Sequence, residues 1–157
     1  MIQAYRLVKR KWASHAFDGQ GAKRYGGRWN SKGRSCVYLT GSVALGLLEV
    51  MVHINDYTIL QQYTVFELQF EFSDLYRLSE RFLPADWQSY PAPLSTADIG
   101  DQWLDKNESA VLAVPSVIVP HEYNYLLNPV HADFDGIIGN AKEIAFRADP
   151  RLARRDA

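Results

Sequence analysis

The sequence has a single cysteine, Cys36, and four histidines among its 157 residues. One cysteine excludes an internal disulfide and any metal site built from several cysteines. The histidines lie far apart in the chain and show none of the spacings typical of metal ligands. They are His15, His53, His121 and His131. The sequence therefore predicts no metal site and a reduced, packed thiol at Cys36.

Long apolar runs and a surplus of charge of either sign are also missing. Lys and Arg together number 17 against 18 Asp and Glu, which gives a net charge of −1 and a pI near 6.4. This balance lacks the basic footprint of a nucleic-acid-binding protein. No segment approaches the length of a transmembrane helix or of a signal-peptide core. We expect a cytoplasmic protein that binds neither membranes nor nucleic acid directly, in one domain spanning residues 1–157.

The hydrophobic pattern predicts an α+β fold in which short helices cover a mixed or antiparallel sheet. A polar, glycine-bearing loop is expected over residues 15–27, and a turn at 133–136. Residues 79–102, broken by three prolines, predict a covering lobe with two short helices. Strands are expected at residues 5–8, 36–40, 62–70, 74–77, 110–114, 117–119, 124–127 and 143–146.

A helix expected after the capping residue Ser42 carries one charged residue, Glu49. Apolar residues continue on every face of this segment, which predicts a helix that is buried all round. A carboxylate in that setting needs a cation, a hydrogen-bond network or a wet cavity, because burying an unpaired charge is costly. Glu49 is thus a candidate catalytic carboxylate. The alternative is a structural residue that pairs with Arg28 or reaches the surface.

Two further candidates precede that helix. Gly26 and Gly27 come directly before Arg28, and their backbone leaves room for a ligand beside the guanidinium. In the strand that follows, side-chain alternation turns Tyr38 away from Val37 and Leu39. Arginine, tyrosine and glutamate on a loop, a strand and a helix suit an anion-binding pocket with one carboxylate. A plain glycine turn and a core tyrosine are the alternatives.

With these residues in hand, the chain resembles the RES domain family, the toxin half of bacterial RES–Xre toxin–antitoxin pairs. The family is named after its arginine, glutamate and serine. The shared features occur in the same order and at compatible spacing nearly from end to end. They are residues 5–7, 27–30, Gly33, 37–39, 44–50, 114–116 and 124–129.

The resemblance implies a relative of the ADP-ribosyltransferase toxins, with a split, twisted β-sheet around a cleft for NAD. It implies cleavage of the nicotinamide–ribose bond of NAD by water or phosphate, which would deplete cellular NAD and arrest growth. NAD would then be a substrate, and no cofactor is expected. The implied partner is an Xre-type helix-turn-helix antitoxin that covers the active site, in a complex with a toxin homodimer.

Residue roles follow from the same resemblance. Glu49 would stabilise the positive charge that develops on the ribose, in the manner of a glycosidase carboxylate. Arg28 and Arg6 would clamp a phosphate or a ribose through their planar guanidinium groups. Tyr38 would stack on the nicotinamide ring. These assignments make Glu49, Arg28 and Tyr38 the expected catalytic residues.

Two more residues are expected to contact NAD. Ser116 follows the Val114-Pro115 pair and would hydrogen-bond an amide, ribose or phosphate oxygen, with Ser109 as the competing candidate for the serine of the family. Asn128 is a further candidate. A serine that satisfies only its own backbone is the structural alternative to a functional Ser116.

Other functions remain open at this point. A mono-ADP-ribosyltransferase with a protein acceptor would use the same residues. An RNA-cleaving toxin could use His53 with Glu49, or His121 with Glu122, as acid and base. A non-catalytic binding module would keep Arg28 and Glu49 as a buried ion pair. The sequence leaves undecided the acceptor, the oligomeric state, the antitoxin surface and whether residues 79–102 gate the cleft.

Overall fold

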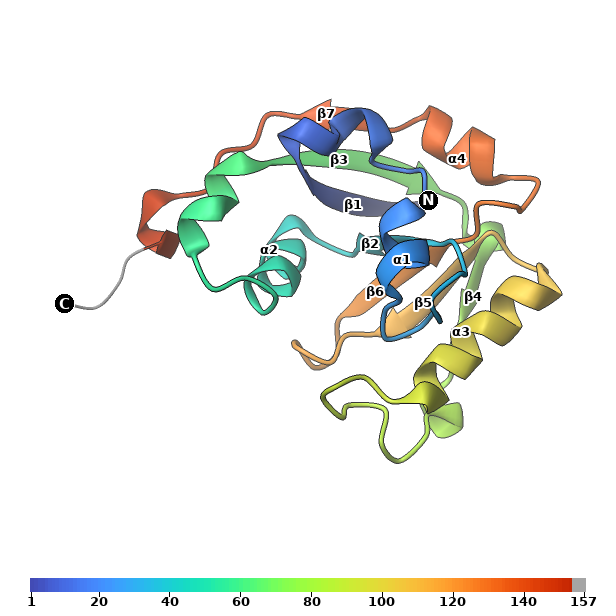
Figure 1. Ribbon diagram of the computed structural model, residues 1–157. Coiled ribbons are helices and arrows are strands. Elements are labelled where there is room, and N and C mark those ends of the chain that lie inside the picture. The colour runs from blue at the N-terminus through green and yellow to red at the C-terminus, as the bar shows by residue number, and fades with distance from the viewer. Residues whose placement is uncertain (154–157) are drawn as a thin grey trace.

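The computed structural model describes residues 1–153 and contains, within them, one sheet of seven strands (Figure 1). The strand order is β4-β5-β6-β2-β1-β3-β7. Only β4 and β5 pair in parallel among these strands, so the sheet is mixed. The strands are β1 Ile2–Lys9, β2 Val37–Thr40, β3 Tyr63–Phe70, β4 Leu75–Arg77, β5 Val111–Pro115, β6 Tyr123–Leu127 and β7 Lys142–Ile144.

Short helices surround this sheet, and the α+β prediction is confirmed. The α-helices are α1 Gln20–Tyr25, α2 Val43–Met51, α3 Leu94–Lys106 and α4 Phe134–Gly139. Single-turn and two-turn 3₁₀ helices form η1 Arg10–His15, η2 Tyr57–Gln62, η3 Phe72–Asp74, η4 Glu80–Phe82 and η5 Pro150–Ala153. Every expected strand is present except the one at residues 117–119, where the chain bends away after Pro115.

Three local expectations are corrected. Residues 15–27 are not a continuous loop, because α1 forms within them, and the expected turn at 133–136 opens α4. The helix that carries Glu49 is not buried all round. Leu45 and Gly46 are buried, whereas Leu48 is 40% exposed and Val52, which caps the helix, is 58% exposed. The outer face of α2 is therefore apolar but accessible.

The sheet is nearly divided between β1 and β2. β1 pairs with β3 along its whole length, and β2 pairs with β6 along its whole length, but β1 and β2 share the single register pair Tyr5 and Thr40. Figure 1 shows β1 and β3 on one side of this junction and β5 and β6 on the other. The predicted split, twisted sheet is thus confirmed, and the two halves diverge beside β2.

The alternation predicted for β2 decides which side chains face this divergence. Val37 and Leu39 belong to one buried cluster, with Leu68, Leu127 and neighbours. Cys36 and Tyr38 point to a second cluster formed with Trp29, Trp103 and Leu126. Since side chains of a strand alternate between faces, Tyr38 and Thr40 lie on the face that lines the gap.

Candidate active site

A cavity of about 1230 Å³ opens where β1 and β2 diverge. Its volume exceeds that of pockets that hold drug-sized ligands and suits a larger molecule such as a dinucleotide. The cavity contains four of the predicted residues, Arg6, Arg28, Tyr38 and Glu49. Its walls include residues 5–7, 26–32, 38–40, 52–54 and 92–94, together with Asn124 and parts of α1 and α2.

Glu49 lies on α2 and lines the cavity. The Ser42 side chain accepts a 3.0 Å hydrogen bond from the Leu45 amide and caps the helix, as expected. The Oε1 atom of Glu49 accepts two hydrogen bonds, at 2.7 Å from Asn124 Nδ2 and at 3.3 Å from Ser116 Oγ. Within residues 1–153, Oε2 accepts no hydrogen bond. It is also not a buried oxygen, because the buried side-chain oxygens and nitrogens without a partner do not include it. Oε2 is therefore the carboxylate oxygen open to the cavity.

Ser116 lies beside Glu49, as expected, but its hydroxyl is already engaged. Its Oγ accepts 3.1 Å hydrogen bonds from the backbone amides of Ile118 and Val119 while it donates to Glu49. The side chain is 3% exposed. Ser116 thus holds the carboxylate and the bend after β5. Its hydroxyl hydrogen is therefore not free for a ligand, although the family resemblance implied a hydrogen bond from Ser116 to NAD.

Arg28 faces the cavity from the loop after α1. Its Nη1 donates to the carbonyl oxygens of Trp87 at 2.8 Å and Ser89 at 2.9 Å, which ties residues 87–89 to the cavity wall. No ion pair joins Arg28 to Glu49 in the described part of the chain. Partial burial lowers the pKa of Arg28, and the charge of Glu49 opposes that shift. Its Nε and Nη2 make no hydrogen bond to the described residues.

Tyr38 anchors the loop that carries Arg28. Its hydroxyl donates to Asn30 Oδ1 at 2.7 Å and accepts from the Trp29 amide at 3.1 Å. Burial raises the pKa of Tyr38 well above its usual value, so the phenol stays protonated and can keep donating. Asn30 in turn donates to the Ala22, Ser31 and Arg34 carbonyls. Tyr38 lines the cavity, and its hydroxyl fixes the wall.

Arg6 spans the split of the sheet. Its Nε donates to the Ala16 carbonyl at 2.9 Å, and its Nη1 donates to the Tyr38 carbonyl at 3.0 Å. The bond to Tyr38 satisfies a carbonyl of β2 where pairing with β1 has ended. Burial lowers the pKa of this guanidinium, and the nearby Cys36 and Asp18 act against that shift. Arg6 lines the cavity as expected, and two of its five N–H donors hold the fold together.

Two sequence candidates lie elsewhere. Asn128 is 1% exposed, and its Nδ2 donates to Asn107 Oδ1 at 2.8 Å, so it secures the end of α3 and is not brought to the cavity. Ser109 accepts a 2.8 Å hydrogen bond from Trp103 Nε1 and donates to the Val111 carbonyl. The structure therefore places Ser116, and not Ser109, beside the candidate carboxylate.

Asn124 is a site residue that the sequence reasoning missed. The sequence places it at the start of a strand and in a segment shared with the RES domain family, without a role in the site, yet its amide makes the shorter of the two hydrogen bonds to Glu49. The available signal was an amide side chain in a strand whose neighbours are apolar or aromatic. Strand alternation alone could not reveal which element would face it.

The histidines divide between the cavity and the surface. His53, just beyond α2, lines the cavity that holds Glu49, whereas His121 and Glu122 are exposed and do not line it. Among residues 1–153 no three His, Cys, Asp or Glu side chains cluster as metal ligands would. No helix in this part of the chain is long and apolar enough to cross a membrane.

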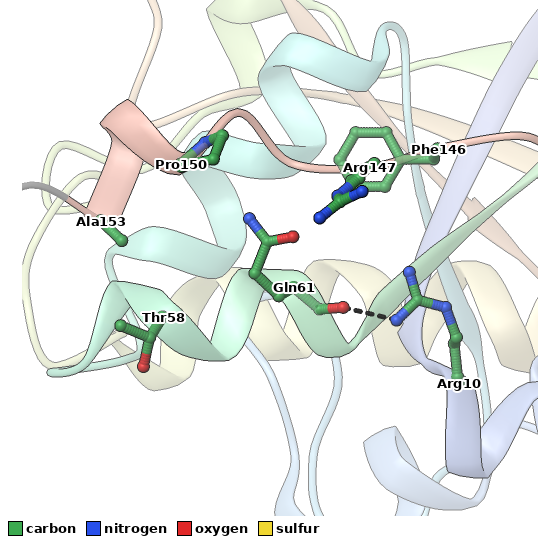
Figure 2. Close-up of a pocket in the computed structure, with 7 residues that line it drawn as sticks. All are labelled: Arg10, Thr58, Gln61, Phe146, Arg147, Pro150 and Ala153. Carbon is green, nitrogen blue, oxygen red and sulfur yellow. Dashed lines mark hydrogen bonds between the residues drawn. The ribbon is translucent and has the colours of Figure 1, made fainter.

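A second cavity, of about 660 Å³, lies between η2 and η5 (Figure 2). Arg10 and Arg147 line it, and Figure 2 shows Arg10 donating to the Gln61 carbonyl oxygen. This cavity contains none of the predicted site residues and no acidic side chain. The candidate active site is therefore the cavity at the split of the sheet.

Comparisons with known proteins identify the family of this chain. Residues 3–149 match the family model described as the RES domain. The chain is 43% identical over 151 residues to "Toxin Res" of Yersinia enterocolitica, covering 96% of this chain and 99% of that protein. It is 38% identical over 153 residues to the "Prs ADP-ribosylating toxin" of Sphingobium, covering 93% and 92%.

A solved structure supports the fold. The Mycobacterium tuberculosis MbcT–MbcA toxin–antitoxin complex contains a chain that superposes with a TM-score of 0.73 at 16% identity, over 97% of this chain and 86% of that one. The model match, the end-to-end similarity to named toxins and the split sheet with its carboxylate-bearing cavity lead to one conclusion. This chain belongs to the RES domain family.

Proposed function

We propose that this protein is the toxin of a toxin–antitoxin pair and cleaves the nicotinamide–ribose bond of NAD. The observation that carries the proposal is the Glu49 carboxylate, held through Oε1 by two donors with Oε2 open to a large cavity. Cleavage of this bond builds positive charge on the ribose, and a fixed carboxylate oxygen stabilises that charge best when it need not reorganise.

The surroundings of Glu49 suit the rest of the substrate. Arg28 retains donors for the diphosphate, and the ring of Tyr38 offers an aromatic surface for the nicotinamide. The cavity holds no cluster of metal ligands in the described residues, and the diphosphate would rely on guanidinium groups. NAD enters this proposal as a substrate, and the acceptor is water or phosphate.

The test is to incubate the purified chain and its Glu49→Gln variant with NAD, with and without phosphate, and to follow free nicotinamide by NMR. We expect release by the wild type and a loss of at least about 100-fold in the variant, the scale of removing one transition-state contact. The variant should still bind NAD. Dependence on phosphate would identify the acceptor.

The control variant is His53→Ala, which removes the histidine that lines the same cavity as Glu49. We expect it to keep NAD cleavage. Failure of the wild type to release nicotinamide, combined with RNA cleavage that needs His53, would overturn the proposal in favour of the RNA-cleaving reading.

A protein acceptor is the second candidate. The relative named "Prs ADP-ribosylating toxin", at 38% identity, favours it because its name records transfer of ADP-ribose. The same groups would break the same bond, and only the acceptor would differ. Labelled NAD in a cell lysate would reveal a modified protein band that disappears with Glu49→Gln.

The proposed partner is an Xre-type antitoxin that covers the cavity, bound to a homodimer of this chain. An exposed apolar rim supports a covering partner. Tyr25, Tyr90 and Leu94 line the cavity and are 71%, 87% and 80% exposed. Exposed apolar side chains gathered around one cavity are typical of binding surfaces.

A further inference from the structure

We infer that Asn124 is a positioning residue for Glu49, a role that rests on the proposed function. Asn124 lies on β6, where its backbone pairs with Thr40 of β2 and with Val114 of β5. Strands on both sides fix its place, so its side chain is presented from a stiff part of the sheet. From there its Nδ2 reaches Glu49 Oε1 at 2.7 Å.

The hydrogen bonds to the Glu49 carboxylate reach only one of its two oxygens. Asn124 and Ser116 both donate to Oε1, from β6 and from the end of β5, and neither donates to Oε2. Two donors on one oxygen stop the carboxylate from turning about its own axis and exchanging its oxygens. Oε2 is thereby held toward the cavity, where Arg28 also lies. A carboxylate fixed in this way is aligned before a substrate arrives.

The side-chain oxygen of Asn124, Oδ1, shows that placing an amide here has a cost. Among the buried side-chain oxygens and nitrogens of the described residues, Asn124 Oδ1 is the one without a hydrogen-bond partner. Leaving a buried acceptor unmet destabilises a fold, and the hydrogen bond that Nδ2 makes to Glu49 offsets that cost. Position 124 thus holds a residue that suits Glu49 better than it suits folding, a pattern typical of functional sites.

The experiment compares Asn124→Leu and Asn124→Asp with the wild type. Leu removes both polar atoms, and Asp keeps the shape but replaces the donor with a second carboxylate. For the nicotinamide-releasing reaction we expect kcat to fall about 10- to 100-fold in Asn124→Leu, with KM changed less than about threefold. The melting temperature of Asn124→Leu should stay close to that of the wild type, because loss of the hydrogen bond to Glu49 is offset by removal of the unmet Oδ1. Asn124→Asp should lose at least as much activity.

A double-mutant cycle distinguishes positioning from plain structural support. In a Glu49→Asp background the shortened carboxylate no longer reaches Asn124, so adding Asn124→Leu should lower the remaining activity less than about threefold. Equal losses in both backgrounds would overturn the inference, as would a kcat for Asn124→Leu within threefold of the wild type. If Asn124→Leu does not fold, Asn124→Ala, which also removes the donor without adding a charge, provides the same comparison.

One readout needs no enzymatic activity. The side-chain amide of Asn124 should give an NMR signal that is absent in Asn124→Leu and that shifts in Glu49→Gln, because its donor then faces a neutral amide. A signal that does not respond to Glu49→Gln would overturn the contact. If the signal responds but the wild type releases no nicotinamide, the proposed reaction fails while the positioning contact stands.

Discussion

At the scale of single residues, the site contains side chains that carry two tasks at once. Tyr38 offers its ring to the cavity and uses its hydroxyl to hold the loop of Arg28. Arg28 faces the cavity and also ties residues 87–89 in place. Such side chains couple the shape of the site to the stability of its walls.

Tyr38→Phe separates these tasks. The ring would remain, but Asn30 Oδ1 would lose its donor and the Trp29 amide would lose its acceptor, so we expect the free energy of unfolding to fall by about 1–3 kcal/mol. Denaturant unfolding measures this change. Tyr5→Phe is the matched control, because Tyr5 lines the same cavity and its hydroxyl makes no hydrogen bond in the described residues. Equal stability of the two variants would contradict the anchoring role.

At the scale of elements, α3 positions the wall of the site through one close approach. A Cβ added at Gly100 would lie 1.6 Å from the Trp29 carbonyl oxygen, so only glycine lets α3 reach the loop of Arg28. Asp101 strengthens the same contact by accepting hydrogen bonds from the Ser31 amide and hydroxyl. The predicted covering lobe, 79–102, thus includes a helix that supports the active-site loop.

Gly100→Ala should displace that loop. We expect the free energy of unfolding to fall by about 1–3 kcal/mol or more, with a parallel loss of NAD cleavage, because the overlap involves backbone that cannot swing away. The control is Gly136→Ala in α4, where an added Cβ meets nothing within 4 Å. That variant should gain about 0.5–1 kcal/mol, since alanine suits a helix interior better than glycine. Thermal denaturation and nicotinamide release measure both effects, and similar behaviour of the two variants would refute the close-approach argument.

At the scale of the whole molecule, one break in strand pairing creates the cavity. β1 and β2 part after a single register pair, and the Arg6 side chain bonds to the β2 carbonyl left at the gap. Each half of the sheet keeps its own continuous pairing. The molecule can therefore hold a large pocket at its centre without leaving β2 unpaired, and the mouth of that pocket carries the exposed rim of Tyr25, Tyr90 and Leu94.

The rim predicts where the proposed antitoxin binds. Tyr90→Asp should weaken binding of the co-purified Xre-type antitoxin by about tenfold or more, because exposed aromatic residues often dominate interface energies. Isothermal titration calorimetry measures the affinity. The control is Phe72→Asp, at a residue that is 68% exposed but does not line the cavity. A partner that tolerates Tyr90→Asp and is lost with Phe72→Asp would bind a different face.

The sequence by itself determined the fold class, nearly all strands, and the loop, strand and helix that hold Arg28, Tyr38 and Glu49. Strand alternation and helix capping are local properties, and they assigned Tyr38 to one face of β2 and placed Ser42 at the start of α2. The ordered motifs of the RES domain family then linked these local features to one site.

Only the tertiary structure decided how the side chains share their hydrogen bonds. Ser116 and Asn124 meet Glu49 across 67 and 75 positions of sequence, and Asn128 is drawn instead to the end of α3. Which donor reaches which acceptor depends on the order of strands in the sheet, and that order is a long-range property that local patterns do not contain. Oε2 of Glu49 likewise stays without a hydrogen bond because Ser116 and Asn124, from distant parts of the sequence, both donate to Oε1.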